Sequence, residues 1–397
     1  MPTSPHSSPS PPDFGRVKVL FVVEGNTDIR FVTGLASVCD LTLLVPQRHY
    51  EGSGLDVRVA ESGATLRVVR IPGGRAAYQA RSFAWLLRYA SRFQVLLTQE
   101  LLRGTLNASL AGRLHRVPVL AHILIPPLEY FACRRARGQN PLTAALGRAV
   151  IRTLLALNGR LVTRCLAWGP YLQTVARRSC RHVEPGHYYG IDTHLFRPAS
   201  ESERAELRAR HHLPHDAFLA LAASRVSHEK DPESALRGAA LARSLGLNLV
   251  LLNLGGGYRE FLDLARQLGL PDCERWVIGR PAQHPMRELA DFFRCADAIV
   301  QASLEEGLAL STLEGLAAGT PVIASQVGGM AVALPGLARL VPRRDPNAIA
   351  RELLWIASHP TEARTQALQG RAWVEHSFRR DLAFEDWRRQ FERAAKV

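Results

Sequence analysis

The feature that most constrains the fold of this chain is a repeated alternation between short apolar runs and longer stretches with helical spacing. In the first half the β-rich runs are VKVLFVVEG at 17–25, LTLLVP at 41–46, LRVVRIP at 66–72, VLLTQ at 95–99 and VPVLAHI at 117–123. Sequences with helical spacing, such as SFAWLLRYASRF, separate them. Strands that alternate with helices predict βαβ units and a parallel sheet in an α/β fold.

The same alternation restarts in the second half of the chain. Its apolar runs are AFLALAAS at 217–224, NLVLLNLG at 248–255, RWVIG at 275–279, AIVQAS at 298–303 and TPVIAS at 320–325. A chain of 397 residues also exceeds the size at which a single hydrophobic core keeps growing. Two doubly wound domains are therefore expected, with a boundary near residue 196 in a polar loop that contains Gly190 and Pro198.

Four segments are predicted from these patterns. They are a disordered tail at 1–14, an N-terminal domain at 15–195, a C-terminal domain at 196–375, and a final helix at 376–397. The spacing of Leu382, Phe384, Trp387 and Phe391 predicts that this last helix is amphipathic and packs back on the N-terminal domain.

The first fourteen residues are rich in Ser and Pro and lack the basic and apolar regions of a signal peptide. Each apolar run ends well before the ~20 residues that a membrane-spanning helix needs. The six cysteines form no C-x-x-C pair and no metal-like spacing, so they are expected to be reduced thiols. A cytoplasmic protein is the expectation.

The net charge of +14 is concentrated in the first half of the chain. Residues 1–200 hold 25 Lys and Arg against 11 Asp and Glu, whereas residues 201–397 hold 25 of each. Residues 101–181 alone contain thirteen Arg and a single acid, Glu129. This distribution predicts an anionic partner for the N-terminal half.

The most informative stretch follows the run AIVQA, where residues 303–324 are predicted to form a loop, a helix at 308–318, a stop at Gly319 and a strand. A helix that starts at the carboxyl end of a parallel strand lies where open α/β sheets bind ligands. Backbone N–H groups of Gly307, Leu308 and Ala309 are expected to form an anion site there, and Gly307 is expected to let a phosphate approach.

Two acids flank this expected anion site. Glu306 is positioned to accept hydrogen bonds from sugar hydroxyls, and Glu314 to accept both hydroxyls of a ribose. The alternative is that both are solvated acids at a helix end, with Glu306 merely favouring the helix dipole.

Basic residues occupy the analogous loop after the first strand of this half. Arg225 and Lys230 lie in ASRVSHEKDP, and the chain contains only three lysines. A guanidinium and an ammonium together suit two phosphates, although an ordinary exposed basic loop is the alternative. Gly255, Gly256 and Gly257 form a further loop after a strand, but they do not match G-x-G-x-x-G.

In this order these pieces resemble the retaining glycosyltransferases of family 4, in the glycosyl transferases group 1. The resemblance covers most of the chain. It rests on YGIDTHLFRP at 189–198, on Arg225 to Lys230, on Ala296 and Asp297 before a strand, and on the E-x7-E signature at Glu306 and Glu314. It implies a GT-B fold, in which two Rossmann-like domains face each other across a cleft.

The resemblance also implies a nucleotide diphosphate-sugar donor. Arg225 and Lys230 would hold its diphosphate, Glu306 its sugar and Glu314 its ribose. As a separate expectation, contacts to the base come from the backbone near Gly279 and Arg280. Retention is usually explained in this family by front-side attack, and neither a metal nor a cofactor is expected. Two departures stand out, because the family usually has Gly at the position of Ala309 and a second Gly at the position of Asn26, beside Gly25.

Residues of the N-terminal half are the expected acceptor side. Similar enzymes carry a histidine near the donor sugar, where this chain has His122; the alternative is a hydrogen-bonded core histidine. Asp28, Glu100 and Glu129 are three candidates to orient an acceptor hydroxyl, and the sequence does not choose among them.

The Arg-rich half leaves two partners open, an anionic membrane surface and a negatively charged acceptor. Residues 134–164 mix Arg with apolar residues at helical spacing, as interfacial helices do, although a scaffold helix with an Arg-rich face fits as well. Nucleic acid is not expected, because no reader motif is present. Two functional alternatives to an enzyme of this family are a non-catalytic binding protein on the same fold and a nicotinamide-dependent oxidoreductase. The G-x-G-x-x-G fingerprint of such an oxidoreductase is absent from the sequence.

Overall fold

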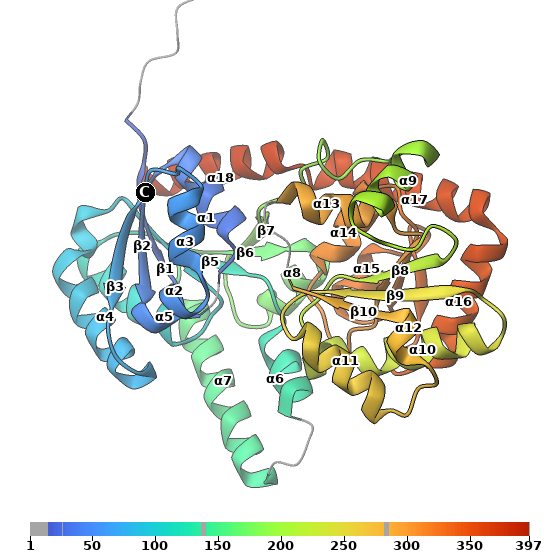
Figure 1. Cartoon of the computed structure of the whole chain (residues 1–397). Coiled ribbons are helices and arrows are strands. Elements are labelled where there is room, and N and C mark those ends of the chain that lie inside the picture. Colours follow the sequence, from blue (N-terminus) through green and yellow to red (C-terminus); the bar gives the residue numbers. More distant parts are fainter. Residues whose placement is uncertain (1–14, 26, 136–139, 282–285, 397) are drawn as a thin grey trace, which may run out of the picture.

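The computed structural model describes residues 15–25, 27–135, 140–281 and 286–396, and shows two parallel sheets side by side (Figure 1). Expectations for the tail at 1–14 and for Asn26 concern residues outside this set. The first sheet has the strand order β3-β2-β1-β4-β5-β6-β7 and the second the order β10-β9-β8-β11-β12-β13. Two Rossmann-like sheets with helices on their faces confirm the predicted α/β class and GT-B architecture.

The first sheet consists of β1 (Lys18–Val22), β2 (Asp40–Pro46), β3 (Arg67–Ile71), β4 (Val95–Gln99), β5 (Val119–Ile123), β6 (Arg164–Trp168) and β7 (Val183–Gly186). Its helices are α1 (Ile29–Val38), α2 (Gln47–Gly52), α3 (Leu55–Glu61), α4 (Arg75–Tyr89), the 3-10 turn η1 (Ala90–Arg92), α5 (Arg103–His115), α6 (Pro127–Arg135), α7 (Pro141–Leu161) and α8 (Gly169–Arg177). The central strands β1 and β4 are mainly apolar, and their side chains are buried except for Lys18 and the half-buried Gln99, as expected for strands covered on both faces.

The second sheet consists of β8 (Phe218–Ala222), β9 (Leu249–Leu254), β10 (Val277–Arg280), β11 (Ala298–Gln301), β12 (Val322–Ser325) and β13 (Arg339–Val341). Its helices are α9 (Glu201–Arg210), the 3-10 turn η2 (His228–Lys230), α10 (Pro232–Ser244), α11 (Tyr258–Gln267), α12 (Cys273–Trp276), α13 (Met286–Cys295), α14 (Leu310–Ala317), α15 (Gly328–Ala333), α16 (Pro346–Ser358) and α17 (Pro360–Ser377). Helix α18 (Arg380–Ala395) completes the chain.

Each sheet has one point at which the strand order reverses. In the first sheet β1 pairs with both β2 and β4, and in the second sheet β8 pairs with both β9 and β11. Loops after these central strands diverge to opposite faces and leave a crevice at the carboxyl edge, which is the usual ligand site of such sheets. The fold therefore brings together the two crevices, one from each sheet, that lie where the strand order reverses.

The chain crosses between the two sheets twice, and the crossings are bonded to each other. Ile191 donates its N–H to the carbonyl of Phe378 (2.7 Å) and accepts from the N–H of Arg380 (3.0 Å). After the second crossing α18 lies on α1: Phe384 fills the space above Gly34, and buried Trp387 donates to the carbonyl of His187 (2.9 Å). The predicted domain bounds themselves stay a prediction.

Two expectations need correction. The apolar runs did not indicate β6, β7 or β13, because β6 and β13 each begin with Arg, β7 contains Glu and Pro, and β7 and β13 are also short. The cysteines were expected to be reduced, but Cys165 on β6 forms a disulfide with Cys180 just beyond α8. The tertiary fold brings together two thiols that are fifteen positions apart.

Candidate active site

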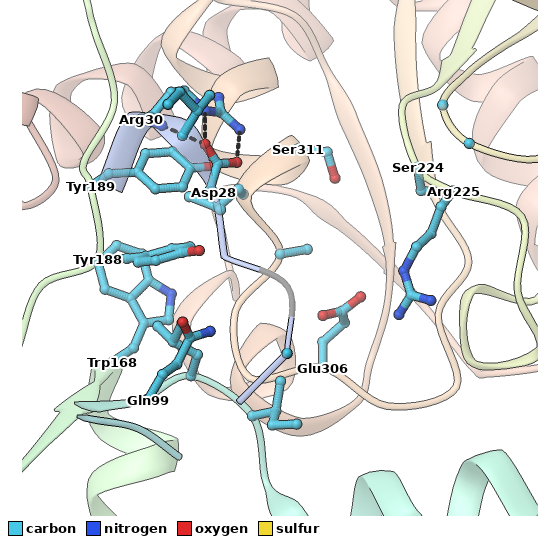
Figure 2. Close-up of a pocket in the computed structure, with 18 of the residues that line it drawn as sticks. Asp28, Arg30, Gln99, Trp168, Tyr188, Tyr189, Ser224, Arg225, Glu306 and Ser311 are labelled. Atoms are coloured by element: carbon cyan, nitrogen blue, oxygen red, sulfur yellow. Dashed lines mark hydrogen bonds and ion pairs between the residues drawn. The ribbon is translucent and has the colours of Figure 1, made fainter. Parts of the chain in front are cut away.

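A cleft of about 990 Å³ lies between the two sheets, at the carboxyl ends of their central strands. It is lined by loops after β1, β4 and β5 on one side and by loops after β8, β9 and β11 on the other. Figure 2 shows the labelled side chains from both sides, with Ser224, Arg225, Glu306 and Ser311 facing Gln99, Trp168, Tyr188, Asp28 and Arg30. The sequence motifs of the second half thus meet loops of the first half in one space.

Glu306 and Lys230 form the centre of the C-terminal side. The ammonium of Lys230 is ion-paired with Oε1 of Glu306, which also accepts from Ser303 Oγ (2.9 Å) and Gln301 Nε2 (3.3 Å). Gln301 in turn accepts from Ser311 Oγ (2.7 Å) on α14. This network fixes the carboxylate and ammonium beside the amino end of α14.

Arg225 is held at the edge of the cleft by two partners. It is ion-paired with buried Glu229 and donates to the hydroxyl of Tyr130 (2.6 Å), which itself donates to Glu229 (2.7 Å). Burial opposes ionisation of Glu229, but the hydrogen bond from Tyr130 and the charge of Arg225 outweigh it and lower the pKa of Glu229. Because Tyr130 lies on α6, this contact joins the two halves of the chain.

Glu314 is paired across the cleft with a residue of the first half. Arg30 on α1 donates to Glu314 (2.7 Å) and to both carboxylate oxygens of Asp28 (3.0 and 2.9 Å), and its guanidinium lies 4.1 Å from the ring centroid of Tyr189. Burial raises the pKa of Glu314, and Arg30 offsets this only in part. For Asp28 burial also opposes ionisation, but Arg30 outweighs it and lowers the pKa.

The helix start differs from the prediction by two residues. Helix α14 begins at Leu310 with Ala309 as its N-cap, so Leu310 and Ser311 form the first turn of the helix at the cleft. The positive end of the helix dipole lies at this turn. Leu308 and Ala309 line the cleft, whereas Gly307 does not. A Cβ at Gly307 would lie 2.2 Å from the carbonyl oxygen of Leu124, so the glycine permits close contact between the two halves. The expectation was that this glycine would let a phosphate approach.

Comparisons with known proteins identify the family of the chain. Residues 203–373 match the family described as "Glycosyl transferases group 1". A D-inositol 3-phosphate glycosyltransferase from Catenulispora acidiphila is 37% identical over 312 residues, which cover 74% of this chain and 72% of the relative. The chain belongs to the group 1 glycosyl transferases.

Two further similarities extend this assignment. A D-inositol 3-phosphate glycosyltransferase from Saccharomonospora viridis is 35% identical over 260 residues, covering 62% of this chain and 54% of that protein. The crystal structure of HepE from Anabaena in complex with UDP-glucose has a TM-score of 0.73 at 15% identity, covering 93% of this chain and 98% of HepE. The latter is a similarity of fold.

In this glycosyltransferase Glu100 follows the last residue of β4 with a left-handed backbone (φ 66°), an uncommon conformation for a residue other than glycine. Its Oε1 accepts from the N–H of Leu124 (3.1 Å), and its other oxygen is buried with no partner among the described residues. Burial raises the pKa of Glu100 to about 8. Glu100 lines the cleft, as do Asp28 and Gly25.

His122 does not line the cleft of this glycosyltransferase. Its ring is completely buried among Phe31, Tyr188 and Trp387, with centroids 5.4, 5.7 and 5.1 Å away. Burial lowers the pKa of His122 to about 3, so the ring is neutral. The structure favours the core alternative, although neither ring nitrogen has a hydrogen-bond partner among the described residues.

Three other predicted residues lie elsewhere. Gly279 and Arg280 are on β10 and do not line the cleft; Arg280 donates to the carbonyl of His211 (2.7 Å) instead. Glu129 on α6 lines a separate depression and is paired with Arg178 (3.0 Å). Neither the assignment of base contacts nor that of Glu129 as an acceptor ligand is supported by this placement.

Several cleft residues of the glycosyltransferase were not singled out from the sequence. Arg30 followed the candidate Asp28 by two positions and was overlooked. Other basic side chains of the first half that line the cleft are His49, Arg58, Arg75 and Arg103. Across the described part of the chain, no group of three or more His, Cys, Asp or Glu has the arrangement of a metal site, and no helix is long and apolar enough to cross a membrane.

Proposed function

We propose that this glycosyltransferase belongs to family 4 and transfers a sugar from a nucleoside diphosphate sugar to a hydroxyl of a phosphorylated acceptor. The observation that carries the proposal is the convergence of Arg225, Lys230, Glu306 and Glu314 on one cleft at two switch points. The cleft volume of about 990 Å³ accommodates a nucleotide sugar together with a small acceptor.

The diphosphate lies, in this proposal, between Arg225, Lys230 and the amino end of α14. Two cations and a helix dipole offset the negative charge that develops on the leaving group, so neither a metal nor a cofactor is needed. Glu306 accepts hydrogen bonds from hydroxyls of the donor sugar, and Glu314 accepts those of the ribose. Ala309 contributes its backbone and keeps that role without being glycine.

The reaction proceeds with retention at the anomeric carbon. The bond from that carbon to the diphosphate oxygen breaks, the acceptor oxygen attacks from the same face, and its proton passes to the departing diphosphate. Lys230 and Arg225 stabilise the charge of this diphosphate. No covalent enzyme intermediate is required, and buried, neutral His122 acts only as support for the cleft wall.

The acceptor phosphate is held by the first half of the chain. Arg58, Arg75 and Arg103 line that side of the cleft, and cationic side chains are suited to a phosphate. Arg58 and Arg103 have other partners, whereas Arg75 at the first turn of α4 is exposed. The relatives named for D-inositol 3-phosphate support a phosphorylated polyol as the acceptor, with Asp28 or Glu100 orienting the reacting hydroxyl.

The proposal is tested in two steps. Thermal shift with a set of nucleotide sugars identifies the donor, because a ligand that binds only the native state raises the melting temperature. Transfer to D-inositol 3-phosphate and to unphosphorylated inositol is then compared in wild type and Arg75→Gln. We expect the variant to raise the KM for the phosphorylated acceptor about tenfold and to leave the KM for the donor unchanged. Equal transfer to both acceptors would contradict a phosphate site.

A non-catalytic binding protein is the second candidate, favoured by one observation. Ala309 and Asn26 stand at two positions where the family usually has glycine. Calorimetry beside a donor-hydrolysis assay separates the two candidates. Donor binding without transfer or hydrolysis of any donor supports the second.

A further inference from the structure

Helix α7 projects away from both sheets, next to α6, as Figure 1 shows. It carries four of the eleven large apolar side chains that are exposed within the described parts of the chain. Leu142 is 77% exposed, Leu146 67%, Val150 50% and Leu157 42%. At 100° per residue these positions lie within one quarter of the helix circumference, so the exposed side chains form a single apolar stripe.

The opposite face of α7 anchors the helix to the protein. Its last turns bury Leu155, Asn158 and Gly159, and Asn158 donates to the carbonyl of Leu102 (2.8 Å). Nearer its start, Gly147 packs against the ring of Phe131 on α6, where a Cβ would be 2.5 Å from the ring. Because this inner face already holds the helix in place, the outer stripe is not required for packing within the described structure.

Charge distinguishes the outer surface of α7 from an ordinary scaffold helix. Arg148, Arg152 and Arg160 are exposed, and residues 141–161 contain no Asp or Glu. At 100° per residue Arg160 lies in line with Leu142 and Arg152 lies about 80° from Leu142 around the helix, whereas Arg148 lies about 120° from it, toward the anchored face. An occupant of this surface must therefore offer apolar groups and negative charge together.

We propose that α7 docks on an anionic lipid bilayer. The leucine stripe enters the boundary between headgroups and acyl chains, while the arginines extend toward anionic headgroups. At about 1.5 Å per residue the helix is ~31 Å long, and it lies on the bilayer without spanning it. A second copy of this chain is a poorer occupant, because two α7 surfaces would bring arginines together. This inference goes beyond the proposed reaction and does not depend on it.

The experiment is flotation or sedimentation of the full chain with vesicles of phosphatidylcholine alone or of phosphatidylcholine mixed with phosphatidylglycerol. Wild type is expected to bind the mixed vesicles, to bind pure phosphatidylcholine at least tenfold more weakly, and to dissociate as salt is added. Equal binding to both vesicles, or none to either, would overturn the proposal.

Variants locate the docking surface. Leu142→Gln combined with Leu146→Gln is expected to reduce partitioning more than about tenfold, because two apolar side chains are lost. Arg152→Gln combined with Arg160→Gln is expected to reduce it about 30-fold on the mixed vesicles. The matched controls are Leu245→Gln, which removes an exposed leucine of the other half, and the pair Arg351→Gln and Arg364→Gln.

Normal melting temperatures of the α7 variants establish that the protein is folded, since all four side chains are exposed. Retained vesicle binding in both α7 variants would show that another surface binds lipid and would overturn the assignment. Self-association that the leucine variant abolishes, with no lipid binding by wild type, would identify a second copy as the occupant and would likewise overturn it.

Discussion

Arg30 donates to Glu314 across the cleft at 2.7 Å, although the two residues are 284 positions apart. Asp28 and the ring of Tyr189 hold the guanidinium in place from the side of the first sheet. Under the proposed function Glu314 binds the ribose of the donor. The guanidinium and the ribose therefore compete for one carboxylate, and donor binding is linked to release of Arg30.

Arg30→Gln is expected to tighten binding of the nucleoside diphosphate about tenfold, because the competing guanidinium is lost. Calorimetric titration with the nucleoside diphosphate measures the dissociation constant. The melting temperature is expected to fall, since removal of one partner leaves the buried Glu314 without its counter-ion. Weaker nucleotide binding in this variant would show that Arg30 contributes to the donor site instead of competing with it.

Glu306→Gln and Lys230→Ala are each expected to lower kcat by about 10²- to 10³-fold, because each removes a charged group from the reacting centre. Steady-state transfer rates with the identified donor are the measurement. Glu305→Gln serves as the matched control, since Glu305 accepts a hydrogen bond from Tyr171 (3.2 Å) and does not line the cleft. The site assignment fails if both test variants transfer at the wild-type rate.

Glu100 is expected to make the stability of the folded protein depend on pH. Burial raises its pKa from an ordinary value of 4.5 to about 8, so between these values the unfolded chain has lost a proton that the folded protein retains. The free energy of unfolding therefore falls as pH rises from about 4.5 to 8. The contribution of protonated Glu100 to stability is fully present only below about pH 4.5. Glu100→Gln removes the effect.

Denaturant unfolding at pH 5 and at pH 8 measures this dependence. The advantage of Glu100→Gln over wild type is expected to be larger at pH 8 than at pH 5. An equal difference at the two values of pH would show that Glu100 ionises as it does in the unfolded chain.

Gly307→Ala is expected to destabilise the protein by about 1–3 kcal/mol, because the new Cβ would clash with the backbone of Leu124 on the other side of the cleft. Chemical unfolding gives the change in stability, and the KM for the donor reports on the cleft. Gly52→Ala is the control, since a Cβ at that helical position meets nothing within 4 Å. A stable Gly307→Ala protein would show that the two halves separate easily.

Much of the fold follows from local patterns. The runs that became β1, β2, β4, β8 and β9 are buried on both faces, so their continuous apolar sequence marks them as strands. Edge strands such as β7 and β13 escaped prediction because they are short and half-exposed, and polar residues or Pro interrupt the pattern. Helix α18 was evident from the spacing of Phe384, Trp387 and Phe391.

The candidate site was only partly accessible to such reasoning. Glu306 and Lys230 stand in motifs that follow strands, and the structure places them in contact. His122 was suggested by the resemblance, and base contacts near Gly279 and Arg280 were a separate expectation, but all three residues lie outside the cleft lining. Whether a residue at a strand end faces the cleft or the core depends on the register of its loop and on the neighbouring helices, which local sequence does not specify.

By itself the sequence determined that two parallel sheets form and that ligand-binding loops follow their central strands, because apolar periodicity and strand-end motifs are local properties. Only the tertiary structure decided that Arg30 reaches Glu314, that Cys165 meets Cys180 and that His122 is enclosed by aromatic rings. These contacts join residues far apart along the chain or on different elements. They arise from how the elements pack, and packing is a property of the whole molecule.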